Sequence, residues 1–230
     1  MKKKIAIFGS TGSIGKTLVD IIKKDKKNFD ILLLTADKDY STLLKQAKKF
    51  NVRNLIITNS LSFEILKKKC KKFNIKVFNN FSSLDKIFKR KIDYVMCSIS
   101  GIEGLIPTFK VIKHTKNIAI ANKEAIISGW NLIKKELLIY KTNFIPVDSE
   151  HFSIWYGLKN NNDLIEKIYL TASGGPFLKL PYSQFKNIKL KDALNHPNWK
   201  MGKKISIDSA TMMNKVFEII EAKNIFNLNY

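Results

Sequence analysis

The sequence predicts an α/β protein in two domains, and three observations lead to this prediction. Short apolar runs of strand character alternate with amphipathic segments over the first part of the chain, a pattern typical of a largely parallel sheet with helices on both faces. A glycine-rich turn joins the first run to the segment after it. Beyond His151 the alternation is lost. We therefore expect a doubly wound domain over residues 1–147 and an α+β domain over residues 148–230.

The first three elements form a βαβ unit. The strand "IAIFG" leads into the turn and helix "STGSIGKTLVDIIKK", and "FDILLLTA" is the second strand. In the second domain, "KIYLTASGGPF" predicts a strand that enters a Gly-Pro turn. The elements expected between these are a helix near 41–50, a strand at 54–58, a helix near 63–73, strands at 75–78 and 93–100, a helix near 104–114, a strand at 117–121, a helix near 123–140 and a strand from 143.

The 230-residue chain has a formal net charge of +22, which favours anionic ligands. Nearly all the positive charge comes from lysine, since Arg53 and Arg90 are the only arginines. Nucleic-acid recognition favours the guanidinium group, and the lysines are scattered along the sequence. We therefore interpret the charge as solvated lysine-rich faces and do not expect a nucleic-acid partner.

The remaining composition indicates a globular intracellular protein. No apolar run approaches the roughly 20 residues that span a bilayer, and the first strand begins too early for a leader peptide to precede it. Only Cys70 and Cys97 are present, so neither a disulfide framework nor a zinc site is expected. These features predict a cytoplasmic protein without a membrane partner.

The turn "GSTGSIG", residues 9–15, follows a strand and opens a helix, which is the context of a dinucleotide-binding fingerprint. Backbone N–H groups and the helix N-terminus would meet a pyrophosphate there, with Thr11 and Ser13 adding hydroxyl groups. The alternative is a tight turn that needs glycine only for its backbone conformation. After the second strand, Lys38 favours the 2′-phosphate of NADP, whereas Asp37 suits a free ribose or simply faces water. We expect a Rossmann-type NADP-binding domain.

Two carboxylates follow an apolar strand in "FIPVDSEHF". If the strand persists, Asp148 and Glu150 point the same way, and their repulsion calls for a cation, a shared proton or solvent. A hard divalent ion with oxygen ligands is one answer, and a solvated strand end is the other. Glu218 is a candidate third ligand, with Asn214 and Lys215 on the same helical face.

Hydroxyl and amide groups near these acids predict a phosphate pocket. Ser173 precedes two glycines that would allow a ligand to approach the backbone, although a plain turn is the alternative. Ser209 is expected to cap the helix that carries Asn214 and Lys215, and a capping role is also assigned to Asp208.

The apolar and aromatic residues in the same region have other expected roles. Met212 and Met213 alternate with the polar groups and are expected to pack in a core. His196 lies in a polar loop, where a ligand role and a surface role are both open. Trp199 and Met201 in that loop predict an apolar lid over a ligand.

Taken in order, these motifs resemble the 1-deoxy-D-xylulose 5-phosphate reductoisomerase family. The resemblance covers the whole chain, and a generic Rossmann protein would not be expected to carry its last three motifs. The motifs are "GSTGSIG", "ANKE", "PVDSEH", "SGGPF", "HPNWKMGKKISIDSATMMNK" and Glu218.

The resemblance implies roles for individual residues. The metal ligands for Mg²⁺ or Mn²⁺ would be Asp148, Glu150 and Glu218. The catalytic set would be these three acids with Lys123 and His196. The substrate would contact Lys123, Ser149, Ser173, His196, Ser209, Asn214, Lys215 and Glu218. The NADPH site would comprise Thr11, Gly12, Ser13, Ile14, Lys38, Asn122, Glu124 and Gly202.

The implied reaction is the rearrangement of 1-deoxy-D-xylulose 5-phosphate and its reduction by NADPH to 2-C-methyl-D-erythritol 4-phosphate, in the non-mevalonate isoprenoid pathway. The metal would polarise the ketone and a neighbouring hydroxyl oxygen. The chain departs from the family pattern at Asp37 and Asp39, beside the expected 2′-phosphate contacts, and at Val216, where a small residue is usual.

Family chains are also longer, continuing into the rest of the catalytic domain and a C-terminal helical domain. We therefore expect that this chain lacks the rest of the catalytic domain and the C-terminal helical domain. The family forms homodimers, but we do not assign a homodimer to this chain. The alternative is an inactive homologue that retains dinucleotide binding or needs a separately encoded remainder.

Overall fold

The computed structural model describes residues 1–159, 166–196 and 202–228. The chain divides into two compact units, Met1–Asp148 and Ser149–Tyr230. The division falls one residue after the boundary expected from the sequence. Each unit is described by itself below.

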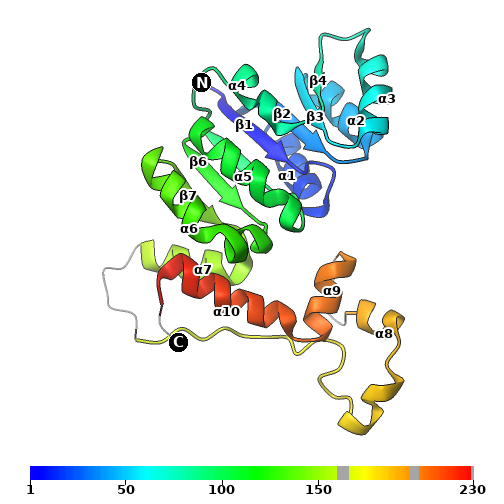
Figure 1. Cartoon of the computed structure of the whole chain (residues 1–230), viewed down its shortest axis with the longest axis vertical. Helices are drawn as coiled ribbons and strands as arrows, with labels where there is room; N and C mark the ends of the chain where they lie inside the picture. Colours follow the sequence, from blue (N-terminus) through cyan, green and yellow to red (C-terminus); the bar gives the residue numbers. More distant parts are fainter. Residues whose placement is uncertain (160–165, 197–201, 229–230) are drawn as a thin grey trace. The chain divides into compact units, whose positions relative to one another are not determined.

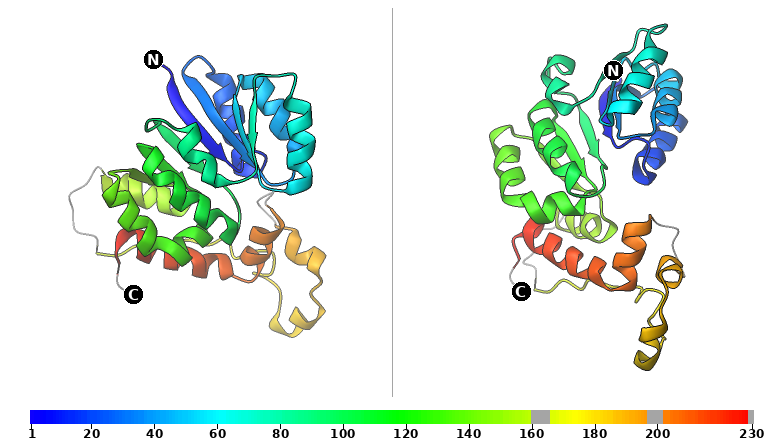
Figure 2. Two further views of the ribbon diagram at one scale, coloured as in Figure 1. Left: turned by 45° about the horizontal axis from the view of Figure 1, so that its top comes forward. Right: turned by 45° about the vertical axis from the view of Figure 1, so that its right-hand side comes forward.

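Unit 1 is built on a seven-stranded parallel sheet in the order β4-β3-β2-β1-β5-β6-β7 (Figure 1). Helices α1, α2 and α3 cover one face of the sheet, and α5 and α6 cover the other (Figure 2). This arrangement confirms the α/β class. The strands are β1 (Lys3–Phe8), β2 (Phe29–Ala36), β3 (Asn54–Ile57), β4 (Lys76–Phe78), β5 (Tyr94–Cys97), β6 (Asn117–Ile120) and β7 (Asn143–Pro146), and the helices are α1 (Ser13–Lys24), α2 (Tyr40–Phe50), α3 (Ser60–Cys70), α4 (Leu84–Ile87), α5 (Leu105–Val111) and α6 (Lys123–Ile139).

The strand order places a topological switch point next to β1. From β1 the chain moves outward through β2, β3 and β4, and then returns to start β5 on the other side of β1. Because all strands are parallel, the loops after β1 and β5 leave the same edge of the sheet in adjacent positions. Open α/β sheets bind ligands in the crevice at such a point.

The apolar runs expected as strands form the core of unit 1. Ile7, Leu34, Leu55 and Ile57 are fully buried and pack with one side of α1 and α2 in a single cluster. Burial raises the pKa of Cys97 to about 12, so this thiol stays protonated at the sheet centre.

The ends of the expected helices shift where a cap or a short turn intervenes. The helix expected near 63–73 begins at Ser60, because Asn59 caps it by accepting a hydrogen bond from Ser62 N. The helix expected near 104–114 is α5 with a 3₁₀ turn on each side, η2 (Ile102–Gly104) and η3 (Ile112–His114).

Unit 2 is helical over the residues that the structure describes. The strand expected in 167–177 is wrong: the segment has no regular secondary structure up to Gly175 and then enters a turn. A strand needs a neighbour to pair its backbone groups, and every strand in the described ranges belongs to unit 1. Over its described residues, unit 2 thus contributes helices to the fold and no strand. The elements are α7 (Ser149–Lys159), η4 (Tyr182–Asn187), α8 (Leu190–Leu194), α9 (Lys203–Ala210) and α10 (Met213–Phe226).

Among the described residues, no helix combines the length and the apolar character that crossing a membrane requires.

Candidate functional site

The glycine turn after β1 contains two glycines that the fold requires and one that it does not. Gly9 has φ +76°, and a Cβ there would lie 2.7 Å from Ser98 O. A Cβ on Gly15 would lie 2.3 Å from Gly9 O. A Cβ on Gly12 would meet only Gly9 O at 3.4 Å, and Gly12 is exposed. The middle glycine is thus available to a ligand that approaches the backbone closely.

The N-terminus of α1 is open to such a ligand. Gly12 occupies the N-cap position, and no side chain caps the first turn. Ser13 and Ile14 are exposed and Thr11 is half-buried. Uncapped N–H groups at the positive end of a helix favour an anion.

The loop after β2 holds both of its acids in local contacts. Asp37 Oδ1 accepts from Thr58 Oγ1 at 2.8 Å, and Asp39 caps α2 by accepting from Thr42 N at 2.9 Å. Burial alone would raise the pKa of Asp39, but the hydrogen bonds from Thr42 and nearby lysines outweigh it, so the pKa lies below its ordinary value. Lys38 is exposed between them. The arrangement leaves a cation available at the end of β2.

Asn122 fixes the loop that follows β5. It is buried and caps α6, and its Oδ1 accepts a backbone N–H of the first turn at 2.6 Å. Its Nδ2 donates to Ile99 O and, at 2.6 Å, to Gly101 O. The side chain thereby ties the start of α6 to the switch-point edge of the sheet. Its capping role was not foreseen from the sequence.

Lys123 and Asp148 pair at the end of unit 1. Lys123 is buried at the first turn of α6, and its Nζ lies 3.5 Å from Asp148 Oδ2. Glu124, the next residue, is half-buried.

The strand does not persist to Asp148 and Glu150, so the condition for their alternation along it is not met. β7 ends at Pro146 and α7 begins at Ser149, so Asp148 lies in the link and Glu150 lies in the first turn of a helix. Aspartate and serine favour helix starts over strands, which explains the early end of the strand.

Unit 2 brings two acids and a lysine together. Carboxylate oxygens of Glu150 and Glu218 lie within 4.8 Å of each other. Lys215 Nζ contacts Glu218 Oε2, lies 3.6 Å from Glu150 Oε1 and donates to Thr171 O. Ser149 Oγ donates to Glu150 Oε2 at 2.7 Å. Glu218 is only 2% exposed, so these contacts must compensate for a buried charge.

Asn214 joins the same group from the start of α10. Its Nδ2 donates to Glu218 Oε1. The i, i+4 relation expected for this pair is confirmed, as is the i, i+3 relation of Lys215 to Glu218.

Ser173 and His196, both expected to bind substrate, are in contact. Ser173 Oγ lies 3.2 Å from His196 Nε2, and His196 is 9% exposed, so the surface role is wrong and the ligand role stays a prediction. Gly175 has φ +67°, and a Cβ there would lie 2.8 Å from Ser209 O. The glycine loop therefore passes directly against α9.

The segment between α9 and α10 differs from the expectation. Ser209 lies inside α9 and caps nothing, because Met212, with φ +61°, occupies the N-cap position of α10. Asp208 also lies within α9 and pairs with Lys204 at 2.6 Å. Met212 and Met213 are 43% and 41% exposed, so their expected packing in a core is wrong. Two acids of α10, Glu218 and Glu221, are nevertheless buried.

Two further expectations concern neighbouring positions. Val216 is 43% exposed, so its side chain does not crowd the interior of unit 2. Gly202 occupies the N-cap position of α9, where a Cβ would have no neighbour within 4 Å. The lid expected around Trp199 and Met201 lies outside the described residues.

Sequence reasoning missed a buried pair in unit 2. His151 is fully buried and Glu221 is 2% exposed, with His151 Nδ1 3.8 Å from Glu221 Oε2. The only available signal was the spacing of Glu218 and Glu221, which places two acids on one face of a helix.

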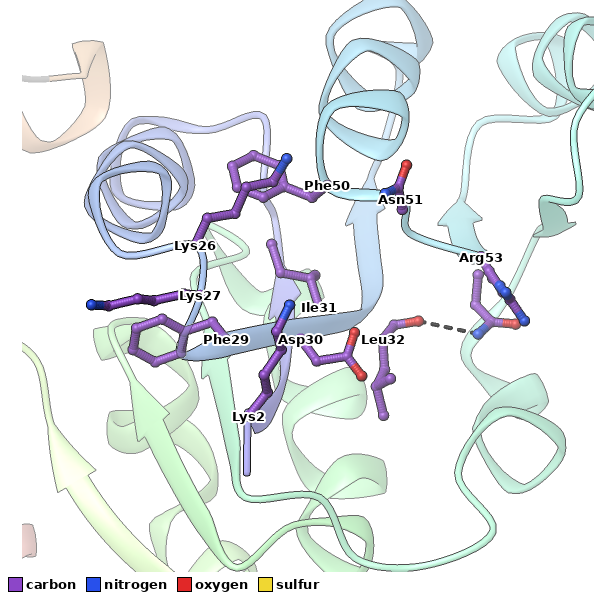
Figure 3. Close-up of a pocket in the computed structure, with 11 residues that line it drawn as sticks. Lys2, Lys26, Lys27, Phe29, Asp30, Ile31, Leu32, Phe50, Asn51 and Arg53 are labelled. Atoms are coloured by element: carbon purple, nitrogen blue, oxygen red, sulfur yellow. Dashed lines mark hydrogen bonds between the residues drawn. The ribbon is translucent and has the colours of Figure 1, made fainter.

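A basic cavity lies at the amino ends of the strands of unit 1, away from the glycine turn (Figure 3). Its volume is about 690 Å³, and Lys2, Lys26, Lys27 and Arg53 line it with Asp30. The lysines that appear scattered in the sequence thus gather partly in space. None of the expected site residues lines this cavity.

Fold and site together define a class: a Rossmann-type α/β protein with a second, helical unit in which two carboxylates converge on a lysine. Comparison with known families gives the particular assignment. A family model described as 1-deoxy-D-xylulose 5-phosphate reductoisomerase matches residues 5–129, and one described as the C-terminal domain of the same enzyme matches residues 144–226. The chain belongs to the 1-deoxy-D-xylulose 5-phosphate reductoisomerase family, as its motifs indicate.

Curated relatives carry the same name. The chain is 67% identical to the 1-deoxy-D-xylulose 5-phosphate reductoisomerase of Pelagibacter ubique, over 99% of this chain and 60% of the relative. It is 43% identical to the 1-deoxy-D-xylulose 5-phosphate reductoisomerase of Wolbachia pipientis subsp. Culex pipiens, over 99% of this chain and 58% of the relative. The chain therefore spans about 60% of the length of these relatives.

Solved structures agree. The Zymomonas mobilis enzyme in complex with NADPH matches with a TM-score of 0.89 and 32% identity, over 100% of this chain and 59% of that one. A structure of DOX-P reductoisomerase in complex with NADPH, fosmidomycin and magnesium matches with a TM-score of 0.87 and 33% identity. The match covers 99% of this chain and 59% of that one.

Proposed function

We propose that this chain contributes the coenzyme site and the metal and substrate ligands of an NADPH-dependent 1-deoxy-D-xylulose 5-phosphate reductoisomerase. The product would be 2-C-methyl-D-erythritol 4-phosphate, formed in the cytoplasm on the non-mevalonate route to isoprenoids. The convergence of Glu150 and Glu218 on Lys215 in unit 2 is the observation that supports this proposal most directly. A Rossmann dehydrogenase has no need of such a group.

The coenzyme site would lie at the switch point of unit 1. The exposed Gly12 and the uncapped start of α1 suit the pyrophosphate, and Lys38 suits the 2′-phosphate of NADPH. Two relatives of known structure are complexes with NADPH. The remaining members of this site would be Thr11, Ser13, Ile14, Asn122, Glu124 and Gly202.

The metal site would use oxygen ligands only. Glu150 and Glu218 already share one cation, the ammonium group of Lys215, so the pair fits a divalent ion in charge and in ligand type. Asp148, two residues before Glu150, would be the third ligand. Mg²⁺ or Mn²⁺ bound there would polarise the carbonyl and hydroxyl oxygens of the substrate.

The substrate would be held by polar side chains. Ser173 and His196, in contact with each other, offer a hydroxyl and an imidazole, and Asn214 and Lys215 offer donors from the start of α10. Binding energy from a phosphate remote from the reacting carbons would orient the substrate. Lys123, Ser149, Ser209 and Glu218 complete the proposed set.

The test compares two preparations, because the chain spans only part of its relatives. One is the 230-residue chain, and the other is this chain fused to the C-terminal segment of the Pelagibacter ubique relative that follows the aligned region. NADPH oxidation that depends on 1-deoxy-D-xylulose 5-phosphate and on Mn²⁺ is measured in both. We expect turnover in the fusion, at least about 100-fold lower in Glu218→Gln because a metal ligand is lost.

The control is Glu166→Gln, which removes an exposed acid of unit 2 that pairs with Lys167 at 3.9 Å. It should retain full turnover. No turnover in either preparation, with NADPH binding intact, would reject the reductoisomerase and support the alternative of a dinucleotide-binding homologue without activity.

A further inference from the structure

The buried pair of His151 and Glu221 lies next to the proposed metal ligands but is not among them. His151 has no exposed surface, and Glu221 is 2% exposed. Burying an ionisable pair contributes little to stability, because desolvation offsets the attraction, and apolar side chains of similar size would pack as well or better. The presence of the pair therefore requires a reason other than stability.

The His151 ring is oriented by three contacts with α10. Its Nε2 lies 2.9 Å from the carbonyl oxygen of Glu218. A carbonyl only accepts, so Nε2 carries the proton and donates it. This leaves Nδ1 facing Glu221 Oε2 at 3.8 Å, while the ring stacks on Phe226 with centroids 6.5 Å apart. The ring is thus locked against one helix.

The main chain of the same residue belongs to the other helix. His151 follows Glu150 directly in the first turn of α7, and its ring is hydrogen-bonded to the carbonyl oxygen of Glu218 in α10. One side chain therefore connects the backbones that carry the two carboxylates. Lys215 holds the two carboxylates through their side chains, and His151 adds a link between the backbones of α7 and α10 that does not depend on that cation.

We propose that His151 and Glu221 are positioning residues that hold α7 against α10 so that Glu150 and Glu218 can bind one divalent ion. Glu221 packs beside the ring with Oε2 3.8 Å from Nδ1, beyond hydrogen-bond distance, and the hydrogen bond from Nε2 to Glu218 O sets the separation of the two ligands. The proposal rests on the metal site proposed above. Partners behind metal ligands commonly set metal affinity in this way.

The experiment measures Mn²⁺ binding to the 230-residue chain by electron paramagnetic resonance. His151→Phe keeps the ring but removes both nitrogens, and Glu221→Leu removes the group that faces Nδ1. We expect each to weaken Mn²⁺ binding by about 10- to 100-fold. Glu221→Gln keeps the size and shape of the side chain beside Nδ1, so we expect a loss of less than about fivefold.

A double variant tests whether the two residues act as one unit. His151→Phe with Glu221→Leu should bind Mn²⁺ about as well as the weaker single variant, since the second change removes a contact already lost. Glu166→Gln is the matched control and should leave the affinity unchanged. Circular dichroism and NADPH binding report whether each variant is folded. If His151→Phe does not fold, the Mn²⁺ affinities of Glu221→Leu and Glu221→Gln test the inference.

Four results would overturn the inference. His151→Phe could bind Mn²⁺ like the unaltered chain, or the two losses could be additive. Glu221→Gln could abolish binding while His151→Phe retains it, which would make Glu221 a ligand. An unaltered chain that binds no Mn²⁺ would overturn the proposed metal site itself, and this inference with it.

Discussion

Replacing Lys215 by methionine removes the cation that Glu150 and Glu218 share. Methionine keeps most of the length of the side chain, so packing changes little while the charge is lost. Glu218 has a side chain only 3% exposed, and that of Lys215 is 15% exposed. Truncating one partner of a buried pair costs about 3–5 kcal/mol, because the other charge is left uncompensated. We expect the lower end, about 3 kcal/mol, because Asn214 still donates to Glu218.

The assay is thermal unfolding of the chain with and without Mn²⁺. In a unit of fewer than 100 residues, a loss of about 3 kcal/mol lowers the Tm by more than about 10 °C. Mn²⁺ should recover more of the Tm in the variant than it adds to the unaltered chain, since a divalent ion replaces the missing charge without displacing a lysine.

Lys204→Met is the matched control on the preceding helix. Lys204 also pairs with a carboxylate, Asp208 at 2.6 Å, but its side chain is 55% exposed, so its loss should cost no more than about 1 kcal/mol. If Lys215→Met costs no more than Lys204→Met, or if Mn²⁺ stabilises both equally, the reasoning about a shared buried cation is refuted.

Three other predictions concern unit 1. Gly15→Ala should lower the free energy of unfolding in urea by at least about 2 kcal/mol, because its Cβ meets backbone atoms; Gly12→Ala should cost less than about 1 kcal/mol yet weaken NADPH binding in a fluorescence titration. Lys38→Glu should weaken NADPH binding about tenfold or more and leave NADH binding unchanged, and equal losses for both coenzymes would contradict a 2′-phosphate contact. Burial lowers the pKa of His114 in the folded state, a shift that Asp85 partly offsets, so stability should fall as the pH drops through the unfolded value of about 6.5; His114→Gln should flatten this dependence in denaturation curves, and an unchanged slope would contradict it.

Much of unit 1 could be predicted because its elements are local patterns. The alternation of apolar runs and amphipathic segments follows from the different periods of strand and helix. The glycine turn is required because a Cβ on Gly15 would collide with the backbone of Gly9. The prediction failed where the pattern was short. Asp148 and Ser149 sufficed to end a strand and start a helix, and the run at 167–172 pairs with no strand among the described residues.

The sequence by itself determined the family, the seven-stranded α/β framework and the residue types available at the site, because these depend on motifs and on spacing along the chain. Only the tertiary structure decided that Lys215 lies between Glu150 and Glu218, and that His151 reaches across to Glu218 and Glu221. His151 and Glu218 stand 67 positions apart. Contacts over such separations come from the packing of α7 against α10, which no local pattern encodes.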